Sequence, residues 1–354
     1  MKRLAVVLFN LGGPDGPDAV QPFLFNLFSD KAIIGAPQPI RWLLAKYIST
    51  KRTPFAQEIY NHMGGKSPIL ELTKAQAKAL QDSLNDKYED QDVQVFISMR
   101  YWHPFSEQTA KDVQAFNPDE IVLLPLYPQF STTTTESSFL DWDKTAKRSE
   151  LIVPTKRICC YPTERGFVGA QAELLKSGVE QAKASGSPVR VLFSAHGLPK
   201  KIVDQKADPY PHHVEDGAQA IVEALKHQGY ELEDWVVSYQ SRVGPLEWIG
   251  PATEDEIKRA GVDQKALVVL PLAFVSEHSE TLVELDIEYK ELAEENGIET
   301  YVRIPAVGTH PEFIKGLSNL VSLALDGDTT ICAQGQNKRL CASADRACPQ
   351  KSFG

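Results

Sequence analysis

Two short apolar segments of the same form constrain the fold of this chain most strongly. They read Ile121-Val-Leu-Leu-Pro-Leu126 and Leu267-Val-Val-Leu-Pro-Leu272. Apolar runs of this length without alternation are typical of parallel strands that are buried on both faces. Because parallel strands need long crossover connections, we expect helices between successive strands. The repeated form therefore predicts two α/β units of related structure within one chain.

Other apolar runs and helical patterns continue the same alternation. We expect further strands at residues 4–9, 93–99, 189–193, 235–239 and 300–304. Apolar residues at helical spacing predict helices at residues 18–28, 69–84, 106–116, 214–227, 254–260, 281–296 and 311–325. Strands that alternate with helices in this way are typical of a parallel sheet with helices on both faces.

The alternation predicts an α/β fold of two Rossmann-like domains, each a parallel four-stranded-type sheet flanked by helices. At 354 residues the chain is long enough for two domains. We expect an N-terminal domain at residues 1–155 and a C-terminal domain at 156–310, with the boundary near Pro154 to Pro162. Residues 311–354 comprise a last helix and a polar, cysteine-bearing extension without periodicity.

Charge and hydropathy limit the partners of this chain. The net charge of −10 at pH 7 argues against nucleic acid, which would require a basic patch. No apolar run approaches the ~20 residues that span a bilayer, and the chain begins with a strand pattern rather than a signal peptide. We therefore expect a cytoplasmic protein. Residues 33–47 mix apolar side chains with Arg41 and Lys46, so they are either a lip that touches the inner membrane peripherally or a helix packed on its own domain.

A single histidine stands at the exit of one predicted strand. The apolar run 189–193 stops at Ser194-Ala195, and His196 follows with Gly197 directly behind it. Ligands of open α/β sheets bind just past the carboxyl ends of the strands, and glycine lets the backbone bend there. His196 is therefore either a hydrogen-bonded turn residue or one half of a site.

The segment after the second repeated strand is rich in carboxylates. Glu280, Glu284 and Glu288 are spaced four apart, so a helix would carry them on one face. Glu277 and His278 lie just before them. One imidazole and several carboxylates suit a divalent first-row metal that is held weakly, and the same groups can accept protons from a substrate. The alternative is an acidic helix face in contact with solvent.

Ordered motifs along the chain carry a resemblance to a known family. Three of them are Leu192-Phe-Ser-Ala-His-Gly-Leu-Pro199, Tyr239-Gln-Ser-Arg-Val-Gly-Pro245 and Phe274-Val-Ser-Glu-His-Ser-Glu-Thr-Leu282. The others are Asn10-Leu-Gly-Gly-Pro14, Gly64-Gly-Lys-Ser-Pro68, Met99-Arg-Tyr101, Leu124-Pro-Leu-Tyr-Pro-Gln-Phe-Ser131 and Asp208-Pro-Tyr210. From about residue 3 to 325 the chain resembles the ferrochelatases. The resemblance implies a chelatase-like fold with the active-site cleft between the two domains. It also implies a lyase that inserts Fe²⁺ into protoporphyrin IX or coproporphyrin, with release of two protons, to form haem.

The resemblance also implies roles for individual residues. The implied catalytic pair is His196 and Glu280. The implied metal ligands are His196, Glu280, Glu277 and His278. The implied path of protons and metal to solvent is formed by Glu284 and Glu288. The implied porphyrin contacts are Asn10, Leu11, Arg52, Tyr60, Ser67, Arg100, Tyr101 and Trp248.

The chemistry of several implied contacts agrees with a porphyrin. Arg52 and Arg100 suit the propionates, because a guanidinium pairs with a carboxylate in a fork. Tyr101 and Trp248 offer flat apolar faces. Taken singly, each aromatic residue could belong to the core and each arginine to a surface ion pair.

Five cysteines remain, and three of them lie in the C-terminal extension. Disulfides are disfavoured in the cytoplasm, so the extension is either a tail with free thiols or part of a metal centre. Some ferrochelatases hold a [2Fe-2S] cluster with three cysteines of such an extension and one from the body of the protein. The ligands implied here are Cys160, Cys332, Cys341 and Cys348, with Cys159 as the alternative to Cys160. The role of the cluster would be structural or sensory, because metal insertion is not a redox reaction.

Two other functions stay open at this point. A cobalt or nickel chelatase that acts on another tetrapyrrole shares the fold, although the series Arg52, Tyr60 and Ser67 favours the haem branch. A non-catalytic porphyrin or haem carrier would need the cleft but would not need His196 opposite Glu280. The oligomeric state, including a homodimer, is also left open.

Overall fold

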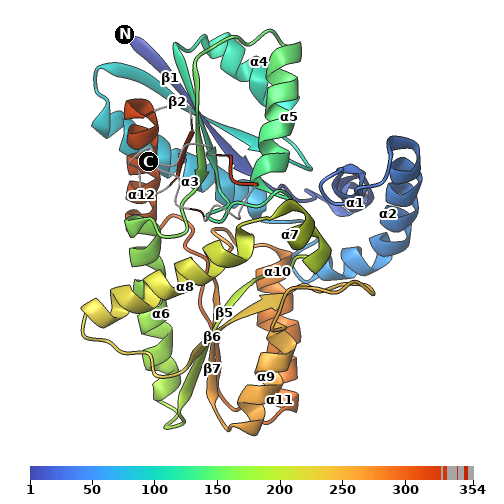
Figure 1. Cartoon of the computed structure of the whole chain (residues 1–354), viewed down its shortest axis with the longest axis vertical. Helices are drawn as coiled ribbons and strands as arrows, with labels where there is room; N and C mark the ends of the chain where they lie inside the picture. The colour runs from blue at the N-terminus through green and yellow to red at the C-terminus, as the bar shows by residue number, and fades with distance from the viewer. Residues whose placement is uncertain (328–329, 333–340, 342–346, 350–354) are drawn as a thin grey trace.

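Two parallel β-sheets, one above the other in Figure 1, organise this computed structural model, which describes residues 1–327, 330–332 by their backbone, 341 and 347–349. Within these residues, the first sheet has five strands in the order β2-β1-β3-β4-β9, and the second has four in the order β6-β5-β7-β8. All the pairings are parallel. The strands are β1 (Lys2–Asn10), β2 (Gln91–Met99), β3 (Glu120–Pro125), β4 (Thr155–Cys160), β5 (Val189–His196), β6 (Trp235–Gln240), β7 (Ala266–Pro271), β8 (Tyr301–Arg303) and β9 (Thr330–Cys332).

Helices connect the strands and cover both faces of each sheet, which confirms the predicted α/β fold. The first half contains a 3-10 turn η1 (Pro17–Ala19), α1 (Val20–Ser29), α2 (Gln38–Asn61), α3 (Ile69–Lys87), α4 (Ser106–Phe116) and α5 (Thr135–Arg148). The second half contains α6 (Arg165–Lys183), α7 (Lys200–Lys206), α8 (Tyr210–His227), α9 (Thr253–Val262), α10 (Ser279–Leu282), the π-helical η2 (Glu284–Glu288), α11 (Tyr289–Glu295) and α12 (Pro311–Asp326).

The central strand β1 shows why the first sheet has no alternating pattern in its sequence. Val6 and Leu8 lie on one face among side chains of α3, α6 and α12, whereas Val7 and Phe9 lie on the other among side chains of α4 and α5. All four are buried, because successive residues point to opposite faces and both faces are covered. Burial of each such side chain contributes roughly 1.5–3 kcal/mol.

The second sheet is built by the same rule. Leu192 and Val269 pack against α9 and α11, and Phe193 and Leu270 pack against α6 and α8. Because β5 and β7 are neighbours in this sheet, their carboxyl ends lie side by side. The sheet therefore brings together the two strand exits at which the sequence predicts functional residues.

The C-terminal segment returns to the first sheet. Phe313 and Leu317 of α12 belong to the same buried cluster as β1 and β3. Beyond this helix, β9 pairs with β4, and Cys332 stands opposite Cys160 in the register. The sequence shows no sign of β9, because three residues are too few to display a period. The strand β4 lies within the stretch from 154 to 162 that was predicted as the domain boundary, and it forms part of the first sheet between β3 and β9.

The prediction of one continuous helix at residues 281–296 is wrong, because the helical segment is interrupted. The structure divides this segment into α10, η2 and α11. At the π-helical turn, the backbone N–H of Glu288 donates to the carbonyl oxygen of Val283, five residues earlier, at 3.0 Å. The spacing of the glutamates therefore does not follow a regular α-helix. Short π-helical turns of this kind occur frequently at functional sites.

The helices α1 and α2 project to one side of the first domain (Figure 1). The sequence singled out residues 33–47 here, and the structure shows a longer helix from Gln38 to Asn61. Its exposed large apolar side chains are Ile40, Trp42, Leu43, Leu44, Tyr47 and Phe55, a set that we call the lip. Among the described residues, no helix combines the length and the apolar character that a bilayer span requires.

Candidate active site

His196 is the last residue of β5, as the strand-exit pattern predicted. Its side chain keeps about 36% of its surface exposed, although Ser194 and Ala195 before it are buried. The N–H of Gly197 donates to the carbonyl oxygen of Gln240 at 2.8 Å. A Cβ on Gly197 would lie 3.0 Å from that oxygen and 3.2 Å from the Trp248 ring. Glycine is therefore required because β6 and the loop after it approach the backbone closely.

Glu280 lies in the first turn of α10 and meets His196 from the neighbouring strand exit. Glu280 Oε1 is 3.7 Å from His196 Nε2, and Glu280 Oε2 is 3.6 Å from His278 Nε2. Burial by itself raises the pKa of Glu280, but the two nearby imidazoles outweigh it and lower the pKa to about 2. Glu280 is therefore a carboxylate near neutral pH, and it lies between two histidines.

Glu284 lies behind Glu280, in the π-helical turn. Its Oε1 accepts hydrogen bonds from the N–H of Ser241 at 2.7 Å and from the Tyr289 hydroxyl at 3.0 Å. Its Oε2 accepts from Gln240 Nε2 at 3.0 Å. Burial and the charge of Glu280 raise the pKa of Glu284. Two adjacent acids are thus held in different environments, one with a low pKa and one with a raised pKa.

Gln240 and Ser241 were not found by sequence reasoning, although both lie in a motif that it quoted. Gln240 also donates to the carbonyl oxygen of Glu280 at 2.9 Å and accepts a hydrogen bond from Ser194 at 2.8 Å. The end of β6 therefore holds both acids in place. Further along, burial raises the pKa of Glu288, and the charge of Glu291 adds to this effect.

The structure does not bring Glu277 to the His196–Glu280 contact. Glu277 Oε1 instead accepts from Arg303 at 2.6 Å and from the N–H of Ala306 at 2.9 Å. Among the described residues, no three His, Cys, Asp or Glu side chains are grouped as ligands of one metal ion. The described arrangement contains the pair His196 and Glu280 with His278 beside it, and the larger ligand set stays a prediction.

Tyr60 links the first domain to this centre. It lies near the end of α2 and is 8% exposed, and its hydroxyl is close to Ser279 and to the Glu280 carboxylate. Burial raises the pKa of Tyr60, so the phenol stays protonated. A residue implied as a porphyrin contact, on α2, thus meets a residue implied in metal binding, on α10.

Other implied contacts are partly engaged with protein groups. Asn10 is buried and donates from Nδ2 to Thr73 Oγ1 at 3.0 Å. Leu11 and Trp248 are partly buried. Ser67 is buried, and its N–H donates to the carbonyl oxygen of Pro14 at 2.8 Å.

The two implied propionate partners differ in their surroundings. Arg100 is ion-paired with Asp30 at 2.9 Å and donates to Ser137 at 2.8 Å. Tyr101 is 1% exposed, and its hydroxyl donates to the same Asp30 carboxylate at 2.8 Å. Arg52 lies partly exposed with its guanidinium 5.9 Å from the centre of the Phe28 ring. Asp30 carries no motif signal, and only the structure identifies it.

The described cysteines lie in buried surroundings: Cys159 and Cys160 pack with Phe130 and Ala347, and Cys341 faces His213 of α8. Cys159, Cys160, Cys341 and Cys348 are all buried. The Sγ atoms of Cys159 and Cys160 are 3.5 Å apart. His213 Nδ1 accepts the N–H of Phe130 at 3.2 Å, so its Nε2 carries the proton that faces Cys341 Sγ at 3.2 Å. The sequence did not single out His213, because it lies far from the cysteines along the chain.

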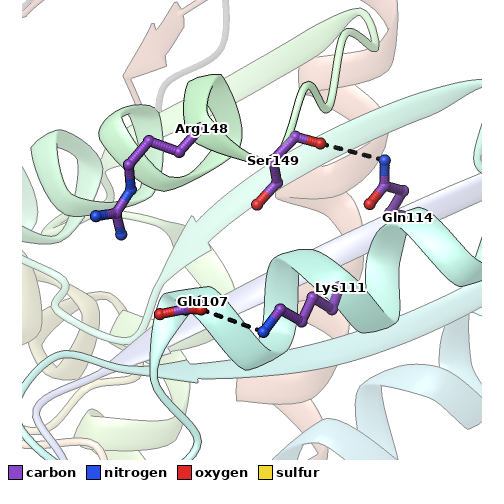
Figure 2. A pocket seen from close by; sticks show the side chains of 5 residues that line it. All are labelled: Glu107, Lys111, Gln114, Arg148 and Ser149. Carbon is purple, nitrogen blue, oxygen red and sulfur yellow. Dashed lines mark hydrogen bonds and ion pairs between the residues drawn. The ribbon is translucent and has the colours of Figure 1, made fainter.

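The surface hollow in Figure 2 lies between α4 and α5 and has a volume of about 380 Å³. It is lined by Glu107, Lys111, Gln114, Arg148 and Ser149. Hydrogen bonds within the hollow join Lys111 to Glu107 at 3.1 Å and Gln114 to the carbonyl oxygen of Ser149 at 3.2 Å. None of these residues belongs to the site predicted from sequence, and their polar groups are largely paired with one another.

Comparison with known proteins shows which family this chain resembles. Residues 3–325 match the family model described as Ferrochelatase. A ferrochelatase of Caulobacter vibrioides is 55% identical over 322 residues, which cover 90% of each chain. A ferrochelatase of Rickettsia bellii is 46% identical and covers 98% of this chain and 95% of its own. Among solved structures, SirB from Bacillus subtilis with Fe³⁺ has a TM-score of 0.50 at 13% identity, covers 93% of this chain and 99% of its own, and shares the fold.

The extent of these matches identifies the family. The matched residues run from β1 to α12, so they include strands of both sheets and lack only β9. The chain therefore belongs to the ferrochelatase family, whose members are lyases that insert Fe²⁺ into a porphyrin to make haem.

Proposed function

We propose that His196 and Glu280 form the catalytic pair of this Fe²⁺ insertion. The main support for this proposal is the 3.7 Å contact between the two side chains, which lie at the carboxyl ends of neighbouring strands. In the reaction Fe²⁺ enters the ring and two pyrrole N–H protons leave, so a metal-binding group and a proton acceptor must face the same ring. A carboxylate and an imidazole are suited to these two tasks.

The environments of the pair favour one division of labour. Because the pKa of Glu280 is about 2, this carboxylate stays charged and can attract the incoming cation. His196 keeps part of its ring accessible and takes up pyrrole protons through Nε2. His278 lies on the far side of Glu280 and orients it. Glu277 contributes indirectly, because its ion pair with Arg303 holds the start of the same segment.

We assign the path to solvent to Glu284 and Glu288. The raised pKa of Glu284 makes it a better proton acceptor than an ordinary carboxylate. Its position behind Glu280 lets it receive protons from the centre or pass metal toward it. Glu288 lies further along the same segment, where it is partly exposed.

The porphyrin is proposed to lie between the two domains, over His196 and beside Tyr60. Arg52 and Trp248 are partly exposed and offer a propionate partner and a flat apolar face. The other assigned contacts are Asn10, Leu11, Ser67, Arg100 and Tyr101. Protoporphyrin IX and coproporphyrin both fit this proposal, and a comparison of kcat/KM for the two decides between them.

The cysteines are proposed to hold a [2Fe-2S] cluster through Cys160, Cys332, Cys341 and Cys348, with Cys159 in reserve. The donor chemistry fits, because three of these cysteines are buried and the backbone of Cys332 is paired with that of Cys160. His213 can donate a hydrogen bond to the Cys341 sulfur. Such a cluster supplies one-electron chemistry, which insertion does not use, so its role here is structural or sensory. A reducing cytoplasm keeps such thiolates available.

The lip is proposed to contact the surface of the inner membrane. Its exposed apolar side chains project from one long helix, and the exposed Lys46 on the same helix suits anionic headgroups. Arg41 is instead partly buried and donates hydrogen bonds to Ser29, Ala36 and Gln38. A porphyrin is flat and apolar, so a membrane beside its binding site would favour its transfer. A homodimer through the lip is the alternative arrangement.

Anaerobic incubation with Fe²⁺ and protoporphyrin IX, followed by the Soret band, tests the function. The wild-type chain should form haem, and His196→Ala should lose insertion while it still quenches porphyrin fluorescence on binding. Unchanged function of His196→Ala would instead indicate a carrier. Faster insertion of Co²⁺ or Ni²⁺ into another tetrapyrrole would indicate a different chelatase.

A further inference from the structure

One buried amide of the first domain is bonded to the metal-site loop of the second domain. Gln76, on α3, is 0% exposed. Its Nε2 donates to the carbonyl oxygens of Val275 at 2.8 Å and Gly308 at 3.0 Å, and its Oε1 accepts from the Ser276 hydroxyl at 2.9 Å. Both donors of the amide are therefore used on backbone groups beyond β7.

These contacts continue to the catalytic pair in short steps. The carbonyl oxygen of Ser276 lies 3.2 Å from His278 Nδ1. His278 Nε2 lies 3.6 Å from Glu280, whose other oxygen faces His196 at 3.7 Å. A shift of the loop at Ser276 would therefore move His278 and Glu280 together.

The same face of α3 also contacts Asn10, one of the implied porphyrin contacts. Thr73 precedes Gln76 by three residues, so both lie on one side of the helix. Thr73 accepts a hydrogen bond from Asn10, which ends β1. A single rigid helix thus connects the end of β1 to the loop after β7.

We propose that Gln76 is a positioning residue for metal insertion: it sets the position of the His278–Glu280 segment relative to the porphyrin face of the first domain. The inference rests on the proposed roles of His196 and Glu280. It follows from burial, because water cannot replace hydrogen bonds in a closed interior and a displaced loop would leave polar groups unsatisfied. Gln76 therefore acts on the metal-dependent step and not on porphyrin binding.

The chain offers a matched control on the same helix. Gln81 Nε2 donates to the carbonyl oxygen of Val93 at 2.6 Å, and its Oε1 accepts from the N–H of Val95 at 2.7 Å. These bonds stay within the first domain. Gln76→Glu and Gln81→Glu remove the same donors and add the same charge, but only Gln76→Glu disturbs the contact between the domains.

The experiment measures porphyrin binding by fluorescence and initial rates of Fe²⁺ and Zn²⁺ insertion. Gln76→Glu should lower kcat/KM for metal by about tenfold or more, while the porphyrin Kd changes less than about twofold. Gln81→Glu should lower Tm and leave kcat/KM for Fe²⁺ and for Zn²⁺ near the wild-type values. Ser276→Ala, which removes one bond and retains both Gln76 donors, should show a smaller change in the same direction.

Equal effects of Gln76→Glu and Gln81→Glu on the metal parameters would overturn the proposal, because both would then report general destabilisation. Wild-type metal kinetics in Gln76→Glu would overturn it as well. If Gln76→Glu does not fold, Ser276→Ala decides: a metal-specific loss supports the proposal, and unchanged kinetics overturn it. Failure of the proposed function is separate, since it would appear as full insertion by His196→Ala.

Discussion

The Nε2 atom of His196 lies 3.7 Å from the Oε1 atom of Glu280, although the two residues follow different strands of the second sheet. The pairing of β5 with β7 creates this contact. His278 lies only two residues before Glu280 and contacts its other carboxylate oxygen, whereas His196 reaches Glu280 from a distant part of the sequence. The site is therefore a consequence of strand order. Substitution of either residue should impair the same reaction, the insertion of metal.

Removal of the Glu280 charge should separate metal insertion from substrate binding. Glu280→Gln retains the size of the side chain and removes the negative charge between two imidazoles. We expect kcat/KM for Fe²⁺ to fall about 100-fold, the loss typical of one missing electrostatic group, with porphyrin binding retained. Glu295→Gln, at the exposed end of α11, is the matched control. Equal activity of both variants would contradict the assigned role.

The cysteine assignment predicts different outcomes for two adjacent residues. Wild-type protein purified anaerobically should show visible charge-transfer absorption and about two iron atoms per chain beyond any substrate iron. Cys160→Ser should lose this signal, and Cys159→Ser should keep it. The reverse result would make Cys159 the ligand. Absence of bound iron in the wild-type chain would remove the cluster from the proposal.

The lip predicts binding to lipid vesicles. Wild-type protein should sediment with vesicles that contain anionic lipid, and the double variant Trp42→Ser, Leu43→Ser should bind more than about tenfold more weakly, since each side chain contributes roughly 1.5–3 kcal/mol. Ile152→Ser, at an exposed apolar residue outside α2, is the control. The alternative is a homodimer through the lip. It would be favoured if the wild-type chain does not bind vesicles and elutes as a dimer in size-exclusion chromatography, while the double variant elutes as a monomer.

The pair Asp30–Arg100 predicts a pH dependence of stability. Burial raises the pKa of Asp30, but Arg100 and the hydrogen bonds from Ser137 and Tyr101 outweigh it, so the pKa lies below the ordinary value of 3.8. A lowered folded-state pKa means that the stabilisation is fully present above about pH 3.8 and is lost as the pH falls through the folded value.

Asp30→Asn should therefore lower the free energy of unfolding by about 3 kcal/mol at pH 7, because Arg100 loses its close partner and keeps only Asp141, at 3.9 Å. The difference between the two proteins should be the same at pH 5 and should shrink only at lower pH. Denaturant titrations at these pH values measure it. Asp82→Asn, in an exposed pair with Lys78, should cost less than about 1 kcal/mol. A difference that already shrinks between pH 7 and pH 5 would contradict the assignment.

Several features of the fold could be predicted from residue patterns because they are local. Apolar runs such as 121–126 and 267–272 indicate strands buried on both faces, and their alternation with helices indicates parallel sheets. The exit positions of His196 and Glu280 followed from the same pattern. Local composition is sufficient here, because burial on two faces selects apolar residues at every position of a strand.

Other features depend on contacts between segments that are distant in sequence. Asp30, Gln76 and His213 carry no motif signal, and their roles depend on partners that only the folded chain brings near. The π-helical turn at Glu284 and the pairing of β9 with β4 are likewise invisible in the pattern. Residue order thus specified the layers and the ends of the strands, because burial acts on each segment separately. The tertiary structure decided which polar groups meet, because a buried hydrogen bond is defined by both partners and not by either segment alone.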